Sequence, residues 1–183
     1  VIYPAIAFFI GIIFFYLTVR KLFDPKIALV ASLMLTIVPS FLYRTMSGFS
    51  DKEAFSMMML FLGFYLFISA WQSKNKWNAL ALGVLAGLVT GINGLVWGGV
   101  SFVYFIFGLF ALVIILLDKS SEIDFYAYVG WFIPAIYFAT QTSLSRTSLG
   151  NMAVSITSGA MFFAFILVLV DFVVFKHDFF KVK

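Results

Sequence analysis

The 183-residue sequence contains no cysteine, so a disulfide framework and a thiolate metal site are both excluded. Charged residues are also scarce. They make up 11% of the chain, whereas hydrophobic residues make up 63%, and the mean hydropathy is +1.09. In soluble domains, about a quarter of all residues are charged. The composition therefore indicates a membrane protein.

The net charge of +4 does not indicate a nucleic-acid partner. The basic residues stand in short clusters between apolar runs, which is how membrane proteins set their orientation. We therefore expect no nucleic-acid binding. The chain begins inside an apolar segment without an initiator Met, and we expect it to be part of a longer polypeptide.

Apolar runs of about 20 residues recur along the chain, and this length crosses about 30 Å of hydrocarbon. The alternating ten-residue pattern of barrel strands is missing, and only helices otherwise satisfy their backbone in lipid. The sequence therefore predicts an all-α, polytopic transmembrane helix bundle that forms a single domain over residues 1–183. We place its helices, about seven in number, at residues 1–19, 27–43, 53–72, 77–94, 97–117, 124–141 and 152–175.

The basic residues predict the orientation of these helices. Successive connections lie on alternate sides of the membrane, and nine of the 12 basic residues fall on one side. Arg44, Lys52 and Arg146 fall on the other side. Because cytoplasmic connections carry the excess of Lys and Arg, the first side is predicted to be cytoplasmic. Asp51 and Glu53 are then the only acids on the outer side of a cell membrane.

Gly83, Gly87 and Gly91 recur every four residues along the fourth predicted helix. Small residues at this spacing allow two helix backbones to approach closely. We therefore expect this helix to lie in the interior of the bundle.

Asp51 and Glu53 have two interpretations. Ser50 followed by Glu53 ahead of an apolar run is a capping-box pattern, and acids in a first helical turn favour the helix dipole. Alternatively, two carboxylates on a turn at a helix N-terminus can bind one cation. Oxygen ligands without His or Cys suit Mg²⁺ or Mn²⁺. Two carboxylates do not complete a coordination shell, so other groups must supply the remaining ligands.

The segment Arg44-Thr-Met-Ser-Gly-Phe-Ser-Asp-Lys-Glu53, preceded by Val38-Pro39, resembles the second acidic motif of the oligosaccharyltransferase catalytic subunit. Further similar segments follow in the family's order, although the last has one extra residue before its Met and no acid after its Ser: Arg20-Lys-Leu-Phe, Trp97-Gly98-Gly99, and Arg146-Thr-Ser with Met152-Ala153. The resemblance extends over nearly the whole chain.

This resemblance implies the membrane half of a GT-C glycosyltransferase. The implied reaction transfers an oligosaccharide from a polyprenyl or dolichol-type phosphate carrier to the Asn of an Asn-x-Ser/Thr sequon. Asp51 and Glu53 would hold the metal, Glu53 would also help to orient the acceptor amide, and Arg44 would hold the carboxylates in place. Arg146 would attract the phosphates of the lipid carrier.

The family's first catalytic Asp, its flexible Glu-bearing loop and its sequon-reading domain have no counterpart within this chain. The resemblance therefore implies that residues 1–183 contain half of a metal site and are inactive alone. Two alternatives stay open. One is another GT-C enzyme that uses the same type of lipid donor on a different acceptor. The other is a membrane transporter with an outer cation site, although a transporter should place ionisable groups near the midplane.

Overall fold

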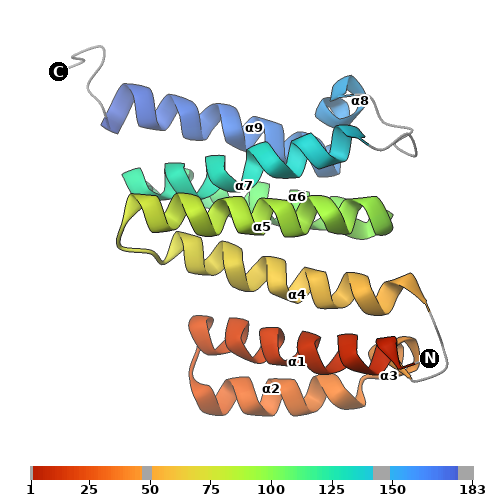
Figure 1. Ribbon diagram of the computed structural model, residues 1–183. Helices are drawn as coiled ribbons and strands as arrows, with labels where there is room; N and C mark the ends of the chain where they lie inside the picture. Colours follow the sequence, from red (N-terminus) through yellow and green to blue (C-terminus); the bar gives the residue numbers. More distant parts are fainter. Residues whose placement is uncertain (1, 47–50, 142–148, 177–183) are drawn as a thin grey trace.

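The computed structural model describes residues 2–46, 51–141 and 149–176. The described residues form helices and no strands, which confirms the all-α class (Figure 1). The elements are α1 (Tyr3–Leu22), α2 (Pro25–Ile37), α3 (Pro39–Thr45), α4 (Lys52–Trp71), α5 (Lys76–Val96), the 3₁₀ turn η1 (Gly98–Val100), α6 (Ser101–Leu116), α7 (Glu122–Gln141), α8 (Leu149–Val154), α9 (Ile156–Val170) and the π-helical turn η2 (Asp171–Lys176).

Capping residues explain where two of these helices begin. The Asp24 side chain accepts hydrogen bonds from the backbone N–H groups of Lys26 and Ile27, at 2.7 and 2.9 Å, and Pro25 occupies the first helical position of α2. The Asn75 side chain accepts from the N–H of Trp77 at 2.9 Å and begins α5. Both side chains satisfy donors that a helix start leaves without partners.

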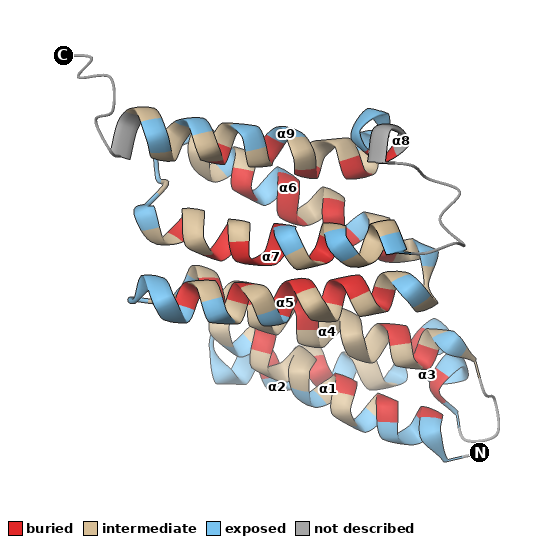
Figure 2. Ribbon diagram, turned by 45° about the horizontal axis from the view of Figure 1, so that its top comes forward, coloured by how far each residue is buried: buried red, intermediate tan, exposed pale blue. Residues whose placement is uncertain are grey.

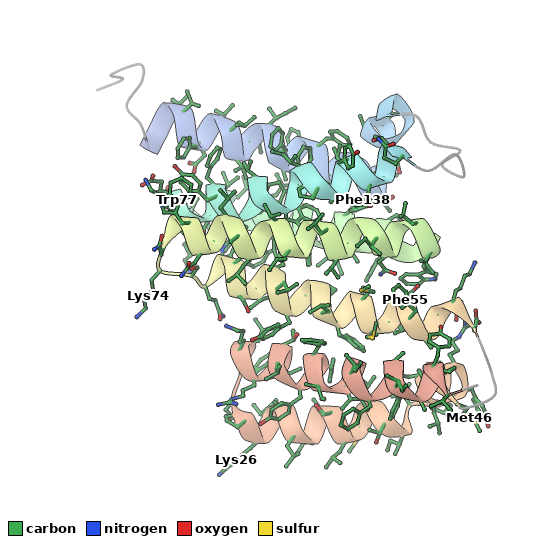
Figure 3. All side chains as sticks on the ribbon, viewed as in Figure 1. Lys26, Met46, Phe55, Lys74, Trp77 and Phe138 are labelled. Atoms are coloured by element: carbon green, nitrogen blue, oxygen red, sulfur yellow. The ribbon has the colours of Figure 1, made fainter. Side chains whose placement is uncertain are left out.

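The long helices run side by side, and their connections alternate between two ends of the bundle (Figure 1). Lys26, Lys74 and Trp77 lie at one end, which we call the basic end, and Met46 lies at the other (Figure 3). Within the described residues, α1, α4, α5, the segment Gly98–Leu116 and the segment Ile156–Val174 are long and apolar enough to span a membrane. The pair of α2 and α3 makes a sixth candidate if it counts as one span. The domain is therefore a polytopic membrane bundle.

α7 also has the length of a membrane span but is not among the strongly apolar helices. Its buried residues include Asp124, Tyr128 and Trp131, which are polar or carry a polar group. A helix in the interior of a bundle contacts other helices more than lipid, so it tolerates such residues when they have partners. The Tyr128 hydroxyl group donates to the carbonyl of Met161 at 3.0 Å, and the Trp131 indole N–H donates to the Thr90 hydroxyl at 3.2 Å.

The second predicted segment, residues 27–43, is not one continuous helix in the structure. It is broken at Val38, and α2 and α3 are bent by 68°. Proline has no N–H group to continue the helix, and it forces the preceding residue out of the helical region. Val38 accordingly has an extended ψ of 116°, and Pro39 begins α3. The last predicted segment is likewise divided, at the extended residue Ser155 between α8 and α9.

The glycines of α5 face α7, and buried residues gather along both helices (Figure 2). A Cβ atom on Gly83 would lie 2.5 Å from the carbonyl oxygen of Ala127, and one on Gly87 would overlap the carbonyl of Trp131. The backbones of α5 and α7 therefore touch, as the four-residue spacing of the glycines predicts, and α5 lies inside the bundle.

An aromatic cluster joins α4, α6 and α7 beside this contact. Phe67 of α4 stacks on Phe107 of α6 with ring centroids 3.9 Å apart, and Phe107 meets Trp131 of α7 at 5.1 Å. All three side chains are almost fully buried. Aromatic pairs at these distances stabilise a core beyond their buried area. Because Phe67 lies near the C-terminal end of α4, these contacts fix that end of the helix against α6 and α7.

Candidate functional site: a carboxylate pair at the start of α4

Asp51 and Glu53 lie at the N-terminus of α4, at the end of the bundle opposite to the basic end. Asp51 is the N-cap residue of α4, and Glu53 lies in the first turn. Met46, the residue after α3, and Phe55, two residues after Glu53, lie on this side of the bundle (Figure 3). We call Arg44, Asp51 and Glu53 together the Arg44 cluster.

Arg44 at the end of α3 forms ion pairs with both carboxylates. Its Nη1 atom lies 3.8 Å from Oδ2 of Asp51, and it also pairs with the carboxylate of Glu53. The side chains are partly exposed, at 45% for Arg44, 32% for Asp51 and 22% for Glu53. Ion pairs this open to solvent add little stability. Their main effect is to bring two carboxylates of like charge together at one point.

The break at Pro39 explains how Arg44 reaches the start of α4. The bend turns α3 away from the axis of α2, and α3 contacts α1 and α4 as well as α2. Phe41, which is 6% exposed, anchors α3 by packing on Phe8 of α1 at 5.2 Å and on Phe61 of α4 at 6.0 Å. α3 is thus held across the end of the bundle with Arg44 in its last turn.

The capping interpretation fits Asp51 poorly. α4 begins at Lys52, so Asp51 occupies the N-cap position, and its side chain makes no capping hydrogen bond. Ser50, the N-cap of the predicted capping box, lies outside the described residues. Glu53 remains in the first turn, where a negative charge favours the helix dipole. The carboxylate of Asp51 is therefore available for another contact, and in the structure it faces Arg44.

Two further residues hold the N-terminal part of α4, and sequence reasoning missed both. The Asn93 side-chain amide of α5 donates to the backbone carbonyl of Ser56 at 3.2 Å, and both residues are buried. The Tyr3 hydroxyl group at the start of α1 contacts the backbone of Asp51 and of Phe55. No local pattern marks Tyr3, because its partners lie 48 and 52 residues away in the sequence.

Asp51 and Glu53 are the residues of this site that could hold a metal ion. Carboxylate oxygens without His or Cys are the donor set that Mg²⁺ and Mn²⁺ prefer. The part of the chain that the structure describes contains no group of three or more His, Cys, Asp or Glu residues suited to a metal. The pair therefore amounts to a partial ligand set. Arg146, predicted to contact lipid phosphates, lies outside the described residues.

The fold and this site define a polytopic α-helical membrane domain with paired carboxylates at one end of the bundle. The family profile described as "Oligosaccharyl transferase STT3, N-terminal" matches residues 1–182. The chain belongs to this family.

Individual relatives agree with the family match. The chain is 30% identical over 122 residues to the dolichyl-diphosphooligosaccharide–protein glycosyltransferase subunit STT3B of Arabidopsis thaliana, covering 67% of this chain and 16% of that protein. It is 34% identical over 104 residues to the dolichyl-phosphooligosaccharide-protein glycotransferase 3 of Archaeoglobus fulgidus, covering 52% and 12%. It is 26% identical over 113 residues to the STT3 subunit of Saccharomyces cerevisiae, covering 62% and 15%. The chain thus matches only a small part of the length of these relatives.

Proposed function

We propose that this chain is part of an oligosaccharyltransferase that transfers an oligosaccharide from a polyprenyl or dolichol-type phosphate carrier to the Asn of an Asn-x-Ser/Thr sequon. The Arg44 cluster is the observation that carries this proposal, because it gathers two carboxylates where a substrate can approach from one face of the membrane. The family membership and the printed names of the relatives support the same reaction. Glycosylation of a sequon peptide by the full-length enzyme tests it.

We assign Asp51 and Glu53 as ligands of Mg²⁺ or Mn²⁺, since both present oxygen donors at the same turn. A bound divalent cation would supply positive charge that stabilises the negative charge developing in the transition state. The rest of the enzyme must supply further ligands, because the described residues provide only this pair of acids at the site.

The acceptor amide is a poor nucleophile because its lone pair is delocalised into the carbonyl. A carboxylate that accepts hydrogen bonds from the amide N–H groups favours a twisted nitrogen with a more available lone pair and fixes its position. We assign this orienting role to Glu53, the less exposed of the two acids. Arg44 offsets the repulsion between the two carboxylates and holds their side chains in one arrangement.

The proposed partners are a lipid-linked oligosaccharide, an acceptor polypeptide with an Asn-x-Ser/Thr sequon, and the remaining parts of the same enzyme. We assign Arg146 to the phosphates of the carrier, since a guanidinium binds phosphate oxygens well. Residues 1–183 alone are then inactive. The proposed location is a cell membrane, with the Arg44 cluster on the extracellular or lumenal side.

The orientation can be tested with introduced cysteines, because the chain has none of its own. Met46→Cys, beside the Arg44 cluster, should react with an impermeant thiol reagent added outside sealed cells. Ser73→Cys, at the basic end, should react only after the membrane is opened. Labelling of both positions from the same side would contradict the proposed topology.

The 183-residue chain by itself should bind Mn²⁺ weakly. Two carboxylates already paired with Arg44 replace too little of the hydration of the ion to hold it tightly. Titration followed by electron paramagnetic resonance of free Mn²⁺ should show no saturation at stoichiometric metal. Tight binding of one Mn²⁺ per chain would mean that residues outside this pair complete the site within residues 1–183.

A further inference from the structure

Tyr3 connects the start of α1 to the first turn of α4. Its hydroxyl group donates a hydrogen bond to the backbone carbonyl of Asp51 and accepts one from the backbone N–H of Phe55 at 3.3 Å. These two backbone groups are four residues apart. They are the carbonyl of the N-cap residue and the first N–H that an α-helix normally bonds to it.

The two helices with side-chain caps, α2 and α5, show the usual arrangement. In α2, the N–H of Ala28 bonds directly to the carbonyl of Asp24 at 3.0 Å, and in α5, the N–H of Ala79 bonds to the carbonyl of Asn75 at 2.9 Å. In α4, the corresponding N–H of Phe55 donates to the Tyr3 hydroxyl group, which in turn donates to Asp51. The Tyr3 hydroxyl group thus replaces the first bond between residues four apart in α4, and the Asp51 carbonyl also accepts a hydrogen bond from the N–H of Ala54 at 3.4 Å.

The position of the Tyr3 hydroxyl group is set by helix packing. α1 packs against α4, and a Cβ atom on Gly11 of α1 would lie at an ordinary contact distance of 3.5 Å from the Cα atom of Met58 of α4. The two helices are therefore in direct contact along this face. Pro4, also buried, occupies the first turn of α1 beside Tyr3. α1 therefore presents the hydroxyl group to α4 at a fixed point.

We propose that Tyr3 is a positioning residue that holds Asp51 in the orientation needed by the carboxylate pair. The Asp51 backbone is fixed on its carbonyl side by Tyr3, and its carboxylate on the other side faces Arg44. Asp51 has φ −111° and ψ 147°, the extended conformation that is usual for an N-cap residue. The effect of Tyr3 on metal binding through Asp51 rests on the proposed function, whereas its effect on the first turn of α4 does not.

Tyr3→Phe in the full-length enzyme removes only the hydroxyl group. The matched control is Tyr137→Phe. Tyr137 is an exposed tyrosine of α7, adjacent to Phe138, which Figure 3 places away from the basic end. The Mn²⁺ concentration that gives half of the maximal glycosylation rate should rise about 10-fold in Tyr3→Phe, as expected when a group that orients a metal ligand is lost. The KM for the sequon peptide should not change, and Tyr137→Phe should behave as the wild type.

Hydrogen exchange provides a readout that does not depend on activity. Backbone amides in residues 52–56 should exchange faster in Tyr3→Phe, because the first turn of α4 loses its tie to α1. Amides of α5 and α7 should keep their wild-type exchange in the same protein, which verifies that the bundle is folded. Tyr137→Phe should leave residues 52–56 unchanged.

The outcomes separate the two proposals. A wild-type Mn²⁺ midpoint in Tyr3→Phe, together with an impaired Asp51→Asn, would overturn the positioning role and leave the proposed function intact. Wild-type metal dependence in Asp51→Asn would overturn the assignment of Asp51 as a metal ligand. In that case, unchanged exchange of residues 52–56 in Tyr3→Phe would overturn the positioning of Asp51 as well, and faster exchange would support it.

Discussion

Glu53→Gln in the full-length enzyme should lower the rate of sequon-peptide glycosylation by about 10- to 100-fold or more while the protein stays folded. The substitution keeps the size of the side chain but removes the charge that pairs with Arg44 and that we assign to the metal. Asp51→Asn should act similarly and should raise the Mn²⁺ concentration needed for half of the maximal rate. Glycosylation rates measured across a Mn²⁺ titration test both variants.

Two residues at the basic end are matched controls. Glu122 is an exposed acid in the first turn of α7, so Glu122→Gln removes the same helix-dipole contribution far from the Arg44 cluster. Asp118→Asn removes an exposed carboxylate at a positive φ of 51°, which Asn tolerates. Both controls should keep the wild-type rate and metal dependence. Wild-type behaviour of Glu53→Gln and Asp51→Asn would leave these acids with a structural role at the start of α4.

Gly87→Ala should lower the free energy of unfolding by about 1–3 kcal/mol, because the added Cβ atom overlaps the carbonyl of Trp131 and forces α5 and α7 apart. Thermal or denaturant unfolding in detergent should show a lower midpoint. The overlap is with backbone atoms, so no side-chain rotation relieves it. Among the substitutions considered, this one should affect stability most.

Gly63→Ala is the control for the effect of alanine itself. Gly63 lies within α4, and a Cβ atom there would meet the Thr90 hydroxyl at an ordinary contact distance of 3.6 Å. Alanine is the better helix former by about 1 kcal/mol, so Gly63→Ala should be neutral or stabilising. Equal losses in Gly87→Ala and Gly63→Ala would show that the close contact between α5 and α7 does not govern stability.

The break at residues 38 and 39 shows how local rules and tertiary structure combine. The sequence Val38-Pro39 disfavours a continuous helix, because the residue before a proline avoids the helical region. Apolar residues nevertheless continue through it, so hydropathy alone predicts one segment over residues 27–43. The bend of 68° depends on where Phe41 packs. Its partners, Phe8 and Phe61, lie on two other helices, so this contact is not visible in the local sequence.

The sequence by itself determined the class of the protein, the approximate positions of its long helices and the contact face of α5. Hydrocarbon imposes these features on any chain that crosses it, since backbone groups must bond within the segment and apolar length must match the membrane. The close approach of α5 to another helix likewise follows from the four-residue spacing of Gly83, Gly87 and Gly91.

Only the tertiary structure decided how the carboxylates are held. Arg44 and Glu53 are close in the sequence, but the bend before α3 and the packing of Phe41 bring them into contact. Tyr3 and Asn93 reach the first turns of α4 from helices distant in the sequence. Contacts between such residues depend on which helices become neighbours, and the pattern of apolar residues that directs each helix into the membrane does not specify its neighbours.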